Sequence, residues 1–219
     1  LLAETHRAFR ERTGQVILER YGMSETVMLT SNPYHGERRP GTVGTPLSGV
    51  EVRLRDDAGA EVPPGGVGEV QVRGPSVFRG YYRRAPGDDF VDGWFRTGDL
   101  GRFDEAGYLC LVGRSKDLII TGGYNVYPKE IELLLDDLPG VAESAVVGVP
   151  HKDFGEAVTA VVVARPGAEV TEAELLAALR GRVAGYKLPK RVHVVDALPR
   201  NAMGKVQKNL LRQRFGGAA

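Results

Sequence analysis

The chain has 219 residues, 42% of them hydrophobic and 26% charged, which is typical of a folded globular protein and excludes a disordered one. The formal net charge of +1 gives no bulk attraction to nucleic acid or to an anionic membrane, and no apolar run approaches the roughly 20 residues of a membrane-spanning helix, so we expect neither partner. The single cysteine, Cys110, excludes an internal disulfide and favours a reducing, cytoplasmic location.

Residues 1–115 are rich in glycine, proline and short β-like runs. They open with LLAETHRAFRERTG, a helix-like pattern without an initiator Met, and we expect the chain to be the C-terminal portion of a longer protein. Residues 50–56 and 67–74 alternate apolar and polar positions around a turn-rich linker, which predicts a β-hairpin. With a further strand at 107–113, this spacing predicts an antiparallel sheet or a distorted barrel, which 91–99 enters as an exposed loop.

Residues 116–219 alternate strand-like and helix-like runs, which predicts a small α+β domain. Three apolar runs predict strands, at 144–149, 157–164 and 191–195. Helices are expected from Pro128, which suits a first helical position, after the capping box at 171–174, and over 205–215. The fold class is therefore α+β, with a β-rich part followed by a smaller α+β part. The polar stretch GRSKDL at 113–118 lies between them, although composition alone does not distinguish a break from a boundary.

Three short stretches carry groups suited to nucleotide chemistry. In YGMSE, Tyr21 offers a flat face to a base, Gly22 a tight turn, and Ser24 a hydroxyl for a phosphate oxygen. The Glu25 carboxylate can hold Mg²⁺, which prefers oxygen ligands and phosphate partners. A polar turn without such a function explains the same residues.

The stretch RTGDLG places Asp99 between glycines, where its carboxylate can accept two ribose hydroxyls. Arg114, fifteen residues further on, can grip the same sugar or a phosphate with its planar fork. In GGYNVYP, Gly122 and Gly123 allow a ligand to approach the backbone closely, and Lys205 follows a glycine in NAMGKVQK. An Asp turn, a helix entry loop and a solvated lysine at a helix start are the plain structural alternatives.

The order of the motifs YGMSE, GTVGTP, GWFRTGD, GRSKD, GGYNVYPKEIE and PRNAMGK resembles the adenylate-forming superfamily of acyl-CoA synthetases, peptide-synthetase adenylation domains and luciferases. The resemblance extends from about residue 16 to about 212. Longer runs are similar to malonyl-CoA synthetases, namely YGMSETVMLTSNPYHGERRPGTVG, DLIITGGYNVYPKEIE, GVPHKDFGEAVTAVVV and LPRNAMGKVQKNLLR.

The resemblance implies a two-step ligase that uses ATP, Mg²⁺ and CoA, in which a small acid such as malonate becomes an acyl-adenylate and then a thioester. For the first step it implies that Tyr21 flanks the adenine and that Gly22 and Ser24 belong to the nucleotide site. It implies further that Glu25 holds Mg²⁺ and that Lys205 is the catalytic lysine.

Further roles follow from the same resemblance. Asp99 and Arg114 would bind the ribose, and Met23 would line the acyl pocket. Gly122 and Gly123 would line the pantetheine tunnel of CoA. Lys116 would be the hinge between a large domain, to which 1–115 belong, and a mobile C-terminal domain at 116–219.

The far carboxylate of malonate needs a cation, for which Arg38 and Arg39 are candidates by charge alone. The glycine-rich phosphate loop of the family, SGTTGxxK, is absent from these 219 residues, so we expect the chain to be inactive by itself. A ligase for another small acid, a peptide-synthetase adenylation domain, and a non-catalytic nucleotide-binding or partner-binding piece remain alternatives. No pattern in the sequence indicates an oligomeric state.

Overall fold

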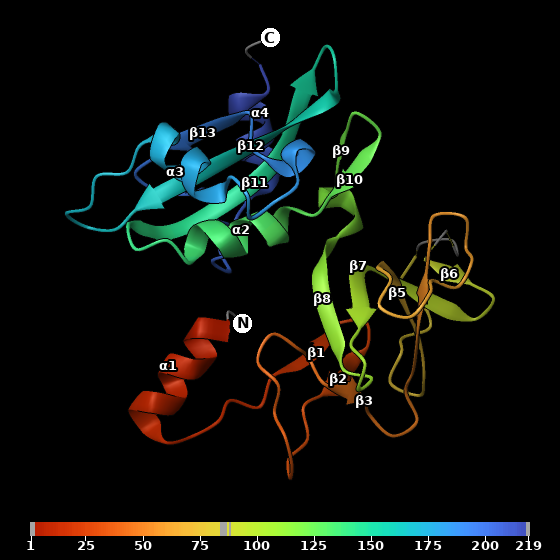
Figure 1. Cartoon of the computed structure of the whole chain (residues 1–219). Coiled ribbons are helices and arrows are strands. Elements are labelled where there is room, and N and C mark those ends of the chain that lie inside the picture. The colour runs from red at the N-terminus through yellow and green to blue at the C-terminus, as the bar shows by residue number, and fades with distance from the viewer. Residues whose placement is uncertain (1–2, 84–86, 88, 218–219) are drawn as a thin grey trace. The chain divides into compact units, whose positions relative to one another are not determined.

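In the computed structural model, which describes residues 3–83, 87 and 89–217, the chain forms two compact units, Leu1–Ser115 and Lys116–Ala219 (Figure 1). The first unit is β-rich and the second mixes strands with helices, so the predicted α+β class is confirmed. No helix within the described residues is long and apolar enough to cross a membrane.

The first unit opens with helix α1 and continues as short strands. Its elements are α1 (Ala3–Thr13), β1 (Arg20–Met23), β2 (Val27–Ser31), β3 (Thr45–Pro46), β4 (Glu51–Arg55), β5 (Gly68–Arg73), β6 (Phe90–Val91), β7 (Trp94–Phe103) and β8 (Leu109–Arg114). Strands β1, β2 and β3 form one antiparallel sheet. The second antiparallel sheet has the order β4-β5-β7, and β6 and β8 both pair with β7.

The predicted hairpin is the β4–β5 pair, in which Arg53 lies opposite Gln71. The two sheets are joined where the Val43 N–H donates to the Leu109 carbonyl and the Leu109 N–H donates to the Gly44 carbonyl, each at 2.8 Å. Within the described residues of the first unit the strands form two open antiparallel sheets and no closed barrel, so of the two predicted forms the antiparallel sheet is confirmed.

Residues 91–99 were expected to be an exposed loop that enters the sheet, and this expectation was wrong from Trp94 onward. Residues from 94 onward belong to β7, the ten-residue strand at the centre of the second sheet. Phe95, Thr97 and Asp99 alternate toward the buried side of this strand. Because two of these three buried side chains are polar, the alternation does not show as an apolar pattern in the sequence.

The second unit is built on one five-stranded sheet. Its elements are η1 (Ser115–Asp117), β9 (Ile119–Thr121), β10 (Tyr124–Val126), α2 (Pro128–Asp136), β11 (Val141–His151), β12 (Gly155–Ala164), α3 (Glu172–Leu179), η2 (Gly185–Lys187), β13 (Arg191–Val194) and α4 (Lys208–Phe215). The order is β10-β9-β12-β11, and β13 pairs parallel to β12. The predicted capping box is present, because the Thr171 side chain accepts from the Glu174 N–H and the Glu174 side chain accepts from the Thr171 N–H.

Both faces of this sheet are covered, which explains its continuous valine runs. Val146, Val158 and Val162 belong to the core that also contains α2 and α3 residues such as Ile131 and Leu179. The alternate residues of the same strands, Ala145, Val147 and Val161, pack instead with Leu198 and Leu211, the latter on α4. A strand that is buried on both faces shows no alternation of polar and apolar residues in its sequence. Its successive side chains still point to opposite faces of the sheet, so they pack into two separate cores.

Candidate functional site

The turn between β1 and β2, residues 24–26, has an unusual backbone. A Cβ atom at Gly22 would lie 1.9 Å from the Val27 carbonyl oxygen, so only glycine fits there. Val27 itself has φ of 56°, a left-handed conformation that is rare for a β-branched residue. Such strain persists where the surrounding structure enforces it, and it concentrates at functional sites.

This turn presents Ser24 and Glu25. Ser24 is exposed, and Glu25 is half-buried. The Phe78 N–H donates to the Glu25 carbonyl at 2.8 Å, and the Tyr81 hydroxyl donates to Oε1 of the Glu25 carboxylate at 2.9 Å. Met23, at the end of β1, is half-buried against the core of the first unit. The turn therefore holds one oriented carboxylate next to an exposed hydroxyl.

A Mg²⁺ ion is implied by the family resemblance, and the Glu25 site can be tested for fit. The described residues contain no group of three or more His, Cys, Asp and Glu side chains that could hold a metal. Mg²⁺ commonly binds through one or two carboxylates together with water and substrate phosphates. The single carboxylate of Glu25 fits that mode and does not fit an all-protein metal cage.

Asp99 lies at the centre of a buried polar cluster made by three strands. Asp99 lies on β7, and the residue is 6% exposed. The Tyr21 hydroxyl of β1 donates to Asp99 Oδ2 at 2.5 Å, and Arg114 Nε of β8 lies 3.0 Å from Asp99 Oδ1. Thr97 Oγ1 accepts the Asp99 N–H at 3.1 Å. Each carboxylate oxygen keeps a second lone pair for another donor.

The pKa of Tyr21 is raised far above its ordinary value, first by burial and then by the neighbouring Asp99 charge. Tyr21 is therefore a neutral phenol that donates to Asp99 at every physiological pH. Tyr21 belongs to the core of the first unit and is 8% exposed as a residue, so little of its surface is open to a base. Sequence reasoning placed Tyr21 and Asp99 in one site but did not foresee the bond between them.

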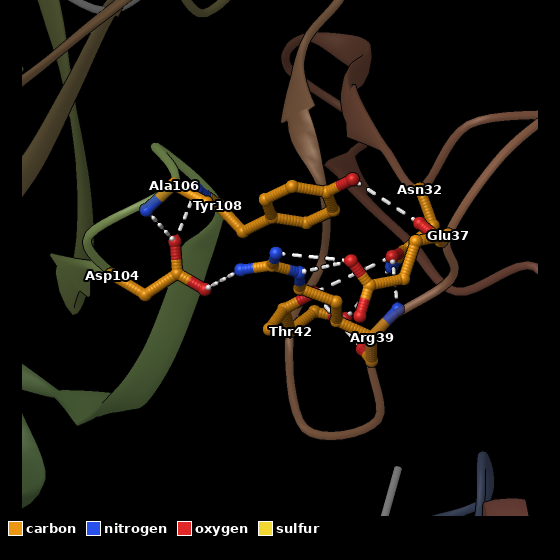
Figure 2. A network of polar contacts seen from close by, with 7 residues as sticks. All are labelled: Asn32, Glu37, Arg39, Thr42, Asp104, Ala106 and Tyr108. Atoms are coloured by element: carbon orange, nitrogen blue, oxygen red, sulfur yellow. Dashed lines mark hydrogen bonds and ion pairs between the residues drawn. The ribbon is translucent and has the colours of Figure 1, made fainter.

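Arg39, one candidate for the far carboxylate of an acid, is occupied within the first unit. Figure 2 shows its guanidinium between two acidic side chains, with Nη2 3.0 Å from Glu37 Oε2 and Nη1 3.1 Å from Asp104 Oδ2. The guanidinium also lies 4.6 Å from the centre of the Tyr108 ring. Hydrogen bonds, first from the Tyr108 N–H and then from Arg39, lower the pKa of Asp104. Arg39 thus ties the 33–42 loop to the turn between β7 and β8.

Arg38, the other candidate, serves the same loop. Its guanidinium donates to three backbone carbonyls, those of Val16, Pro33 and Tyr34. Three carbonyl acceptors use most of the five donors of a guanidinium. Both arginines are half-buried and structural, and neither is a solvated surface side chain.

Gly122 and Gly123 form the two-residue turn of the β9–β10 hairpin, where Thr121 pairs with Tyr124. Their φ angles are +56° and +82°, as a type I′ turn requires at both central positions. The turn is exposed, and the Gly122 N–H donates to the Phe154 carbonyl at 2.8 Å. The hairpin alone is therefore enough to require glycine at both positions.

Aromatic and basic side chains that the sequence did not single out gather beside this turn. We call them the aromatic surface; it comprises Tyr124, His151, Phe154, Tyr186, Lys187 and Lys190. The Tyr124 and Tyr186 rings stack at 4.7 Å, and His151 stacks on Phe154 at 4.7 Å. Lys190 Nζ lies 4.9 Å above the Phe154 ring. These residues come from three separate segments, at 124, 151–154 and 186–190, so no local motif could have revealed them.

Lys205 was expected at a helix start, and that expectation was wrong. Helix α4 begins only at Lys208, and Lys205 belongs to a tight turn in which Asn201 Oδ1 accepts the Met203 and Lys205 N–H groups at 3.0 and 2.9 Å. Lys205 is exposed, and its ammonium makes no hydrogen bond or ion pair with any part of the chain that the structure describes. The lysine is held by its backbone and free at its tip.

Lys116 lies in η1, which spans the boundary between the two units. From α4, Arg212 Nη2 donates to Asp117 Oδ1 at 2.9 Å and to the Lys116 carbonyl at 3.4 Å. One end of the boundary segment is therefore attached to the second unit by a side chain.

Two parts of the chain match one enzyme family. Residues 1–82 match the AMP-binding enzyme domain, and residues 130–205 match the AMP-binding enzyme C-terminal domain. The chain belongs to the AMP-binding enzyme family. The first match contains the turn at 21–25 and the second ends on Lys205, while Asp99, Arg114 and the 122–123 turn lie between them. The predicted resemblance to adenylate-forming enzymes is thereby confirmed.

Several individual relatives of this chain are CoA ligases. The chain is 44% identical to a malonate–CoA ligase of Arabidopsis thaliana, over 92% of the chain and 35% of that protein. It is 43% identical to a long-chain-fatty-acid–CoA ligase of Escherichia coli O6:H1, over 94% of the chain and 37% of that protein. The ATP-bound crystal structure of MatB from Rhodopseudomonas palustris has a TM-score of 0.95 and 56% identity, over 99% of the chain and 44% of MatB. The chain thus spans less than half the length of each relative.

Proposed function

We propose that this chain is part of an ATP-dependent acid–thiol ligase that converts malonate, ATP and CoA into malonyl-CoA, AMP and pyrophosphate. The observation that carries the proposal is the buried Asp99 carboxylate, held by Tyr21 and Arg114 in the unit that also presents Ser24 and Glu25. A carboxylate fixed on both oxygens is preorganised to accept the paired hydroxyls of a ribose.

In the proposed first step the acid attacks the α-phosphate of ATP. Asp99 accepts the ribose hydroxyls, Arg114 closes over the same sugar, and the Ser24 hydroxyl donates to a phosphate oxygen. Glu25 would hold Mg²⁺, which neutralises phosphate charge when bound. The Tyr81 hydroxyl donates to Oε1 and so restrains this carboxylate.

Lys205 supplies the positive charge for this step. Negative charge grows on the five-coordinate phosphorus, and an ammonium between the carboxylate and the α-phosphate stabilises it more than it stabilises the ground state. The exposed ammonium of Lys205 is suited to that role because it has no neutralising partner among the residues that the structure describes.

In the proposed second step the thiol of CoA attacks the acyl-adenylate after the C-terminal unit turns about Lys116. The exposed 122–123 turn would lie along the pantetheine arm, because neither glycine carries a side chain to block it. The aromatic surface beside it offers stacked rings and the ammonium of Lys190, which suit the adenine and phosphates of CoA.

Malonate is proposed because the chain is 44% identical to a malonate–CoA ligase over most of its length. The similar identity to a long-chain-fatty-acid–CoA ligase favours, as the alternative, a ligase for another acid. We assign the cation for the far carboxylate to neither Arg38 nor Arg39, because Arg38 already donates to three backbone carbonyls and Arg39 is paired with Glu37 and Asp104.

The proposal is tested in the full-length enzyme by separating the two half-reactions. Lys205→Ala should slow malonate-dependent pyrophosphate exchange at least about a hundredfold, the order of one lost transition-state contact, and largely spare thioester formation from pre-made malonyl-AMP. Lys129→Ala, on α2, is the matched lysine control. Equal loss in both half-reactions would refute the role of Lys205, and an acid panel in which malonate is a poor substrate would refute the specificity.

We propose further that the 219-residue chain does not catalyse the reaction by itself, because its sequence has no SGTTGxxK phosphate loop. Pyrophosphate exchange by this chain at a rate near that of the full-length enzyme would overturn that statement.

A further inference from the structure

The turn that carries Lys205, residues 200–206, is fixed by its own side chains. The Asn201 N–H donates to the Lys205 carbonyl at 2.9 Å, and the Gly204 N–H donates to the Asn201 carbonyl at 2.9 Å. Asn201 Oδ1 accepts two further N–H groups of the turn. The backbone on either side of Lys205 is therefore closed by local hydrogen bonds.

A second set of contacts attaches this turn to the sheet of the C-terminal unit. The Arg200 guanidinium donates from Nη1 to the Gly204 carbonyl at 2.6 Å and from Nη2 to the Glu143 carboxylate on β11. One planar group thus bridges the residue before Lys205 and a strand of the central sheet. A guanidinium suits this task because its donors point in fixed, divergent directions.

The base of the turn is held as well. Arg200 and Val206 form an isolated β-bridge, and the Gln207 N–H donates to the Pro199 carbonyl at 2.8 Å. Leu198 before the turn and Leu211 after it are 5% and 1% exposed in one core. The turn consequently leaves and rejoins the packed interior at two anchored points.

We propose that Arg200, together with its partner Glu143, is a positioning residue that presents the Lys205 ammonium for adenylation. This inference rests on the proposed function and adds how the lysine is held: as the tip of a braced turn, and not on a flexible loop. Ordering a flexible loop would cost conformational entropy in each turnover, and a braced turn avoids that cost.

The chemistry of the brace predicts different effects for different substitutions. Arg200→Ala removes both contacts, Arg200→Lys can restore one at a time, and Glu143→Gln keeps the shape while weakening the attachment to β11. The Arg191–Glu172 pair, with Nη1 3.8 Å from Oε2, is a matched control in the same unit that does not contact the turn.

The experiment uses the full-length enzyme and three measurements: pyrophosphate exchange, thioester formation from pre-made acyl-adenylate, and amide hydrogen exchange at Met203 and Lys205. For Arg200→Ala we expect adenylation to fall about tenfold to about a hundredfold, the thioester step to change less than about twofold, and turn amides to exchange faster. Arg200→Lys should recover part of the adenylation rate, Glu143→Gln should show a smaller loss, and Arg191→Ala should change none of the three.

The possible failures are distinguishable. If Lys205→Ala loses adenylation while Arg200→Ala keeps it, the brace is refuted and the proposed function stands. If Arg200→Ala reduces both half-reactions equally, its role is general stability and the positioning role is refuted. If Lys205→Ala itself keeps adenylation, the proposed role of the lysine fails, and the brace has no catalytic purpose whatever the exchange data show.

Discussion

Replacing Tyr21 with Phe removes one hydroxyl from the polar cluster of the first unit and leaves the ring in place. The lost bond is the 2.5 Å donation to Asp99, a residue that is only 6% exposed. A hydrogen bond to a charged group contributes about 1.5–3 kcal/mol, so we expect the first unit to lose about 2 kcal/mol of unfolding free energy at pH 7. The cavity contribution is small because phenylalanine keeps the same ring.

The stability difference between wild type and Tyr21→Phe should also depend on pH. The pKa of Tyr21 is raised in the folded state, first by burial and then by Asp99. Above about pH 10 the unfolded chain loses this proton before the folded chain does, so the wild-type stability falls by about 1.4 kcal/mol per pH unit. Tyr21→Phe lacks this proton. The stability gap between the two proteins should therefore narrow from about 2 kcal/mol at pH 7 to about 0.6 kcal/mol at pH 11.

The chain offers a convenient reporter for this measurement. Trp94 is its single tryptophan and lies on β7, the strand that carries Asp99, so its fluorescence during urea unfolding follows the first unit. Tyr82→Phe, at a side chain that is 86% exposed, is the matched control and should change neither value. A gap below about 0.5 kcal/mol at pH 7, or a gap that does not narrow at pH 11, would refute the reasoning.

Four further predictions concern the second unit. Lys116→Pro in the full-length enzyme should restrict the boundary segment and slow thioester formation more than adenylation, and equal losses in both steps would mean that the residue is merely structural. Arg212→Ala removes the contact between α4 and Asp117, so it should speed proteolytic cleavage of the boundary segment. Gly123→Ala places a side chain at φ +82°, so it should destabilise the second unit by about 1 kcal/mol and slow the thioester step. The control Gly59→Ala, at φ +79° in the first unit, should lower stability by a similar amount and leave the thioester step unchanged. Burial lowers the pKa of His193, so as the pH drops below about 6.5 the unfolded chain takes up a proton before the folded chain does, and the unfolding free energy decreases. His193→Gln should make this decrease with falling pH smaller, as measured by chemical denaturation followed by circular dichroism. An unchanged dependence of the unfolding free energy on pH would contradict the prediction.

The arginines of the 33–42 loop show why charge alone is a weak guide to a binding site. Arg38 and Arg39 were candidates for the far carboxylate of an acid by charge alone. The structure directs Arg38 to three carbonyls and Arg39 to Glu37 and Asp104 (Figure 2). Their partners lie up to 65 residues away, so the sequence could not reveal them.

The sequence by itself determined the family, the α+β class, the β4–β5 hairpin and the capping box at Thr171, because each rests on an ordered motif or on local periodicity. Local rules failed where tertiary contacts decided the outcome. Strand β7 was missed because its inward face carries polar residues, and α4 starts late because Asn201 binds the preceding backbone. The Tyr21–Asp99 bond spans 78 positions and the Arg200–Glu143 pair 57, and contacts at such separations exist only once the chain has folded.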